Sequence, residues 1–235
     1  FEMIENLPDW INWLFFLTAI LTVGTFHFAN GKPNKLTLAV VIWSIGQSIL
    51  AYIGFYENTD AIPPRFLLVL IPVFIAIIYG MRRKKLTWVL ENRNIEISTF
   101  LHTVRLPVEI VLFYLFTKNM LPELMTFEGR NFDIIAGITA PIIGVLWIVK
   151  IIDKKVLLIW NIVGLLLILF VFGNGILSSK LPIQLFGFEQ PTVAPNYFPF
   201  ILLPATVVPL VIYSHLTDII KLLKEKQHTT KPKSH

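Results

Sequence analysis

The 235-residue sequence contains no cysteine and few charged residues. Without cysteine the chain has no disulfide, no thiol nucleophile and no cysteine-ligated metal. Charged residues make up only 15% of the chain, against about 25% in a typical soluble domain, and hydrophobic residues reach 55%. A composition this apolar predicts a polytopic membrane protein.

The short motifs of several enzyme classes are also missing. The sequence has no phosphate-binding GxxxxGK[ST], no HExxH zinc motif and no GxSxG nucleophile motif. The last apolar run contains no lysine, which argues against the retinal Schiff base of rhodopsin-like pigments. We therefore predict no cofactor and no resident metal, and the enzyme question stays open at this point.

Seven apolar runs are present, and each is long enough to cross about 30 Å of hydrocarbon, which takes roughly 20 helical residues. They cover approximately residues 10–29, 36–56, 63–81, 100–121, 132–152, 156–178 and 198–220. We predict an all-α fold, a polytopic bundle of seven transmembrane helices over residues 1–220. A polar, basic cytoplasmic tail over residues 221–235 follows it.

Lysine and arginine are unequally divided between the two ends of these runs. One end holds 15 of the 20 basic residues and the other end holds 4, with Arg105 inside a helix. The positive-inside rule places the N-terminus outside and the C-terminus in the cytoplasm. The same asymmetry accounts for the net charge of +5 without nucleic acid, and membrane lipids are the expected partners.

The topology suggests an internal repeat. Ile42 and Trp43 align with Ile159 and Trp160 when the first two helices are shifted onto the fifth and sixth. Helices 1–3 and 5–7 also share one orientation, as in the parallel 3+1+3 arrangement of some sugar transporters. A seven-helix bundle without a repeat fits the same orientation, and both interpretations stay open.

Three ionisable residues lie within the fourth apolar run. His102, Arg105 and Glu109 share one helix face, where such groups turn toward the bundle interior and pair with each other. The spacing lets Arg105 form an ion pair with Glu109, and we predict that Glu109 faces the bundle interior and contacts either Arg105 or a polar residue of the second helix, Gln47. Pro107 is expected to open the helix locally. The pair is either a ligand or proton site at Glu109 or a structural contact.

A second polar cluster lies in the predicted outer loop PELMTFEGRNFD (122–133). It is either a ligand site at the outer mouth or a turn followed by a helix cap. Its candidate ligand-binding residues are Glu128, Arg130, Asn131 and Asp133. The neighbouring loop 181–200 is long, aromatic and rich in proline, which predicts a lid with Phe186, Phe188 and Tyr197 buried.

Polar residues also gather in the predicted cytoplasmic third, namely His27, His102, Asn161, His215 and Asp218. No two of these histidines have metal-ligand spacing on one helix, so separate interfacial histidines are favoured over a metal site. Between the third and fourth runs, residues 86–99 follow RRKK and are amphipathic. They form either a helix on the membrane surface or a loop with one helical turn.

Several phrases together resemble an uncharacterised family of bacterial inner-membrane proteins. They include WSIGQSILAYIGFY (43–56), STFLHTVRLPVEI (98–110), MTFEGRNFDIIAGITAP (125–141) and FGFEQPTVAPNYFPFILLPAT (186–206). The resemblance covers nearly the whole chain, and it implies no activity and no site residues.

The leading functional hypothesis is the binding or translocation of a small molecule through a polar cavity around Glu109 and Arg105. The alternative is an intramembrane enzyme that acts on a lipid or isoprenoid, with Glu109 or Glu128 as acid or base. A non-catalytic membrane sensor or assembly partner is the third class. A continuous polar path favours transport, a closed pocket with two carboxyl groups favours an enzyme, and the lack of a cavity favours the third class.

Overall fold

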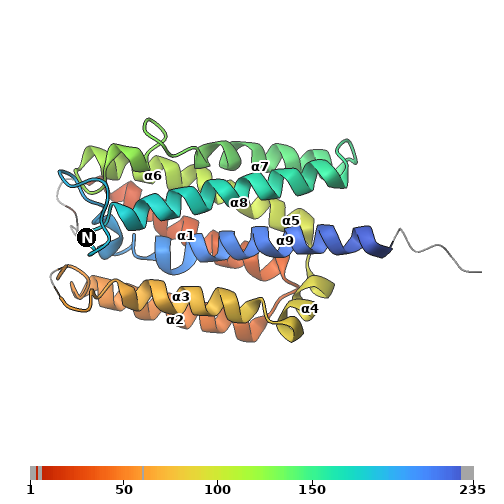
Figure 1. The fold of residues 1–235 in the computed structure, drawn as a ribbon, viewed down its shortest axis with the longest axis horizontal. Coiled ribbons are helices and arrows are strands. Elements are labelled where there is room, and N and C mark those ends of the chain that lie inside the picture. Colours follow the sequence, from red (N-terminus) through yellow and green to blue (C-terminus); the bar gives the residue numbers. More distant parts are fainter. Residues whose placement is uncertain (1–3, 5–6, 60, 229–235) are drawn as a thin grey trace, which may run out of the picture.

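The computed structural model describes residues 4, 7–59 and 61–228, and their regular structure is helical apart from one isolated bridge between Ser179 and Thr192. The predicted all-α fold is therefore confirmed for these residues. The long helices run side by side in one bundle, and α9 leaves it at the end opposite the N-terminus (Figure 1).

Each of the seven apolar runs contains an α-helix. Five segments are long and apolar enough to cross a membrane: α1 (Asp9–Ala29), α2 (Asn34–Tyr52), the α5–α6 segment (Ile95–Thr117), α8 (Lys154–Leu177) and the segment Leu203–Lys224. The other two, α3 (Leu67–Gly80) and α7 (Asp133–Ile148), are apolar but have only 14 and 16 residues. The last helix, α9 (Val208–His228), continues past residue 220, and residues 229–235 of the predicted tail lie outside the described residues.

The segment Leu203–Lys224 lies at the centre of the bundle, and α2 lies at its edge. In the most apolar window of Leu203–Lys224, 78% of the residues are buried, against 11% in α2. Figure 1 shows α9 between the α6–α7–α8 side and the α2–α3 side. Polar residues on α9 are therefore placed to contact both halves of the protein.

The fourth apolar run is not one continuous helix, and its interruption lies just before Pro107. The segment consists of α5 (Ile95–Leu101), a 3-10 turn (His102–Val104) and α6 (Arg105–Thr117). Pro107 has no N–H for the carbonyl of Thr103, and its ring crowds that carbonyl, so the preceding turn tightens. The helix is therefore interrupted just before Pro107, by a tightened turn and not by the local opening predicted from the sequence.

The last span begins with a π-helical turn, Leu203–Val207 (η4). Pro209 has no N–H to donate to the carbonyl of Ala205, four residues earlier. The indole N–H of Trp43 on α2 donates to that carbonyl instead, at 3.0 Å. Beside it, the hydroxyls of Ser44 and Thr206 are 2.7 Å apart, so α2 is attached to the π-helical turn at two adjacent points.

Two connecting segments complete the fold. The basic segment between α3 and α5 forms the ten-residue helix α4 (Arg83–Asn92), which is longer than the single helical turn of the loop alternative. In the loop 181–200, Phe186 and Tyr197 are half-buried, whereas Phe188 is 71% exposed, so its predicted burial is wrong. The buried part of this loop is its second half, which contains the 3-10 turn Ala194–Asn196 (η3).

Candidate functional site

The guanidinium of Arg105 is bound by the carboxylate of Asp133, the first residue of α7. Arg105 Nε donates to Asp133 Oδ2 at 2.6 Å and Nη2 donates to Oδ1, and both side chains are almost fully buried. Nη2 also donates to the carbonyl of Gly164 on α8, at 3.1 Å. This two-point geometry is the strong form of an arginine–carboxylate pair, and it joins α6, α7 and α8.

The predicted ion pair between Arg105 and Glu109 is therefore wrong. The physical reason lies at Gly137, where a Cβ would stand only 2.7 Å from the backbone nitrogen of Leu106. The missing side chain lets α7 approach the start of α6, and this places Asp133, one turn before Gly137, beside the guanidinium. Sequence spacing on one helix gave no signal for this partner on another helix.

Glu109 faces the bundle interior, as predicted, and is 1% exposed. The partner of its carboxyl is Asn131, whose Nδ2 lies 2.7 Å from each of the two carboxyl oxygens. The same amide donates to the carbonyl of Met125 at 3.0 Å, and its Oδ1 accepts the backbone N–H of Asp133 at 2.9 Å. Asn131 thus caps the start of α7 and holds Glu109 at the same time.

The other predicted site residues lie elsewhere. Gln47 accepts a hydrogen bond from the hydroxyl of Tyr56, so it is not the neighbour of Glu109. Burial raises the pKa of Tyr56 to about 12, which keeps this hydroxyl a donor at neutral pH. Glu128 and Arg130 are exposed, so the outer cluster divides into two surface residues and the buried pair Asn131 and Asp133.

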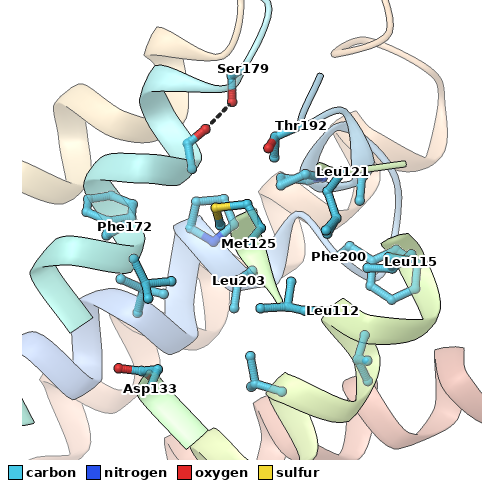
Figure 2. Close-up of a pocket in the computed structure, with 18 of the residues that line it drawn as sticks. Leu112, Leu115, Leu121, Met125, Asp133, Phe172, Ser179, Thr192, Phe200 and Leu203 are labelled. Carbon is cyan, nitrogen blue, oxygen red and sulfur yellow. Dashed lines mark hydrogen bonds between the residues drawn. The ribbon is translucent and has the colours of Figure 1, made fainter. Parts of the chain in front are cut away.

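A cavity of about 60 Å³ lies next to the two carboxyl groups. Glu109 and Asp133 line it together with apolar side chains of α6 and α8 and with Leu203 and Pro204 of the π-helical turn. In Figure 2, Asp133 lies at one end of the cavity, and Ser179 and Thr192 lie at the other. The volume accommodates a few waters or a ligand of a few non-hydrogen atoms.

The second half of the loop 181–200 covers this cavity. Thr192, Ala194 and Pro195 are part of its lining and are buried. The backbone nitrogens of Val193 and Ala194 both donate to the carbonyl of Met120, at 2.9 Å, and fix the loop to the end of α6. The lid predicted from the sequence is therefore made by residues 192–195, and Phe188 is not part of it.

Next to Arg105, two histidines are stacked on each other. The rings of His102 and His215 are 3.7 Å apart between centroids and nearly parallel, and both residues are fully buried. His215 contacts Arg105 Nη1 through Nε2, at 3.2 Å, and Asn161 Oδ1 through Nδ1, at 2.9 Å. Within the part of the chain that the structure describes, neither ring nitrogen of His102 has a hydrogen-bond partner.

The expectation of separate interfacial histidines is wrong for this pair. A Cβ on Gly164 would stand 2.6 Å from His215 Cε1, so the glycine of α8 makes room for the imidazole beside Arg105. His27 does stand apart, with Nδ1 2.7 Å from the hydroxyl of Thr37. Among the described residues, no group of three His, Cys, Asp or Glu side chains is arranged to hold a metal ion.

A second buried ion pair lies at the end of the bundle that carries α4, and sequence reasoning missed it. Arg93, between α4 and α5, has the sequence setting of a cytoplasmic loop residue, yet it is 3% exposed and its Nε donates to Asp218 Oδ1 at 2.5 Å. The hydroxyl of Ser98 donates to the other carboxylate oxygen, also at 2.5 Å. The guanidinium also donates to Asp218 Oδ2 at 3.1 Å, to the side-chain oxygens of Asn30 and Ser98 and to the carbonyl of Ser214.

These contacts join into a file of buried polar residues through the bundle. Direct contacts lead from Glu109 through Asn131, Asp133 and Arg105 to His215. Ser214, the preceding residue on α9, gives its carbonyl to Arg93, which closes the file at Asp218. Within it, Asp133 and Asp218 are each paired with an arginine, whereas the donor to Glu109 is an uncharged amide.

Most of this file falls in a stretch of the chain that matches a family model. The model is described as a domain of unknown function (DUF8737) and matches residues 62–223. The chain belongs to this family. The DUF8737 region contains both ion pairs, the histidine pair and Glu109, whereas Asn30 and Gln47 precede it. No curated protein and no solved structure matches the chain.

Proposed function

We propose that this DUF8737 protein is an integral membrane protein that binds a small cationic solute inside its helix bundle, at Glu109. The observation that carries the proposal is the unequal pairing of the buried acids. Asp133 and Asp218 each lie against an arginine, whereas Glu109 lies against Asn131 and lines the cavity. Among the described residues no lysine or arginine lies within ion-pair distance of Glu109, and a buried carboxylate in this position favours a ligand that brings a positive charge into direct contact.

The cavity also restricts the ligand. Its volume of about 60 Å³ suits only a few non-hydrogen atoms, and most of its lining is apolar. An alkylammonium ion of small size meets both conditions, because its charged group pairs with Glu109 and its methyl groups contact side chains such as Val108 and Leu112. The hydroxyls of Ser179 and Thr192 supply further polar atoms at the far end.

The polar file supports translocation as the purpose of this binding. Chains of buried Asp, Glu and His residues mark ion and proton pathways in membrane proteins. Here the file runs from the cavity under the loop 181–200 to Arg93 at the other end of the bundle. We place the cavity toward the outside and Arg93 toward the cytoplasm of a bacterial inner membrane, with seven spans, on the strength of the loop charges.

An intramembrane enzyme is the second candidate, because two carboxyl groups line one cavity, Glu109 and Asp133. Acid–base pairs of this kind need one carboxyl free to exchange a proton with substrate. Asp133 uses both oxygens for Arg105, so Glu109 would have to act alone. We therefore rank the enzyme second and the sensor third, since a sensor needs no cavity.

The test is a thermal melt of the purified protein with methylammonium, ethylammonium and tetramethylammonium chloride, each compared with KCl at equal ionic strength. At least one of these ions should raise the melting temperature of the wild type and leave that of Glu109→Gln unchanged. The matched control is Glu128→Gln, which changes an exposed glutamate in the loop between α6 and α7. This variant should respond to the ions as the wild type does.

Uptake of radiolabelled methylammonium into proteoliposomes then separates translocation from binding alone. A rise of equal size in Glu109→Gln, or no rise with any of the three ions, would show that Glu109 is not a cation site. A melt of Glu109→Gln without added ions establishes that the variant is folded before the comparison is made.

A further inference from the structure

A second, larger hollow lies on the opposite side of the last span. It is a groove of about 1070 Å³ between α2 and α3, bounded by α4 and by the first turns of the last span. This volume is slightly above the range of about 300–1000 Å³ that ligand sites usually have. Its walls are mainly apolar side chains, among them Val40, Val73, Ile77 and Leu210.

One end of the groove is basic. Lys32 and Lys35 come from the connection between α1 and α2, and Lys84 and Lys85 come from α4. All four are exposed, and no acidic side chain of the described residues lies within ion-pair distance of them. Both pairs line the same groove, and the segment that follows α4 is joined to the end of α1 by the hydrogen bond from the backbone N–H of Asn94 to the carbonyl of Ala29, at 2.8 Å.

The groove is fixed by contacts at its walls and is not a gap between loosely placed helices. Trp43 and Ser44 hold α2 to the π-helical turn by the hydrogen bonds described above. At the basic end, Gly80 of α3 lies directly against Tyr213 of α9, where a Cβ would stand 2.7 Å from the ring. A preformed site loses less entropy when a flexible ligand binds.

We infer that this groove binds an anionic phospholipid of the cytoplasmic leaflet. The lysines take the phosphate, and the apolar walls take an acyl chain that runs along α2 and α3 into the bilayer. The lysines lie at the end where the loop charges place the inner membrane surface, which is the level of the lipid headgroups. Trp88, which also lines the groove, is 44% exposed, as suits an interfacial aromatic residue.

This inference is independent of the proposed cation site. None of the residues that line the groove lines the cavity next to Glu109. The lipid is therefore expected to bind equally well to Glu109→Gln, and failure of one proposal leaves the other standing.

The experiment is native mass spectrometry of the purified protein titrated with dioleoyl phosphatidylglycerol or with dioleoyl phosphatidylcholine. We expect one phosphatidylglycerol to be retained at least about tenfold more strongly than phosphatidylcholine, because lysines near the surface favour anionic headgroups. Lys84→Gln with Lys85→Gln should abolish this preference. The matched control is Lys150→Gln with Lys155→Gln, which removes the same charge from residues outside the groove.

A second pair of variants tests the apolar wall. Ala76→Trp fills the groove and should reduce phosphatidylglycerol retention, whereas Ile75→Trp, at the adjacent exposed position outside the lining, should not. Equal retention of the two lipids would show ordinary bulk lipid, and equal loss in the Lys150 and Lys155 variant would show non-specific charge. Retention of glycerol 3-phosphate as strong as that of the lipid would show a headgroup site only. Each of these three results overturns the inference.

Discussion

Arg105 forms its ion pair with Asp133 on the following helix and not with Glu109, four residues further along its own helix. The pair fixes the start of α7 against α6 and leaves the Glu109 carboxyl to a neutral amide. One buried ion pair thus joins two helices and also leaves Asn131 as the hydrogen-bond donor to the carboxyl group that lines the cavity.

The first prediction concerns the stability of this pair. Asp133→Ala leaves the buried guanidinium without its carboxylate and should destabilise the protein by about 3–5 kcal/mol. Replacing both partners, Arg105→Met with Asp133→Leu, should recover most of that loss. Chemical denaturation in detergent micelles measures both. If Arg105→Met with Glu109→Leu were instead the combination that restored stability, the pairing seen here would be incorrect.

The second prediction uses two glycines of α8. Gly164→Ala places a methyl group 2.6 Å from the His215 ring and should cost about 1–3 kcal/mol through overpacking. A Cβ on Gly173 would meet no neighbouring atom within 4 Å, so Gly173→Ala should be neutral or stabilising by about 0.5–1 kcal/mol. Equal melting temperatures for the two variants would contradict the close contact between α8 and the histidine.

The third prediction concerns the π-helical turn. Trp43→Phe removes the donor to the Ala205 carbonyl, and a buried unsatisfied carbonyl costs about 1–3 kcal/mol. Pro209→Ala restores a backbone N–H in the same helix and should recover part of the loss in the Trp43→Phe background. The double-mutant cycle of the two changes gives the coupling from thermal melts. A coupling free energy of zero would mean that Trp43 does not replace the missing donor.

The fourth prediction is the orientation in the membrane. A reporter enzyme that is active only outside the cytoplasm should work when fused after Met125 and fail when fused after Lys85 or at the C-terminus. The reason is the excess of basic residues at the end of the bundle that carries α4. Activity of the fusion after Lys85 would reverse the whole orientation, including the direction of the polar file.

The helices were the part of the fold that sequence predicted well. Apolar runs and the break near Pro107 are local signals, and each has its counterpart in the structure. The pairing of the charged residues was predicted poorly, because a pattern within one helix does not show which neighbour approaches it. Arg93 illustrates this: among loop arginines it is indistinguishable in sequence, yet it is buried against Asp218, 125 positions away.

The candidate site was predicted in the same uneven way. Glu109, Arg105, Asn131 and Asp133 do come together, while Gln47, Glu128 and Arg130 lie outside the cluster. The small residues that bring the first four together, Gly137 and Gly164, carry no chemical signal of their own. Their role appears only when the neighbouring helix is in place.

The π-helical turn Leu203–Val207 is a partition with a different compartment on each side. Leu203 and Pro204 border the cavity next to Glu109, whereas Ala205 and Thr206 border the lipid groove. Any movement of this single turn changes the dimensions of both compartments at once. If a bound lipid shifts the turn and thereby changes the affinity for the cation, a bound cation must change the affinity for the lipid by the same factor. The reason is that the coupling free energy between two binding sites is reciprocal. The composition of the inner leaflet would then act as an effector of the site on the far side of the same helix.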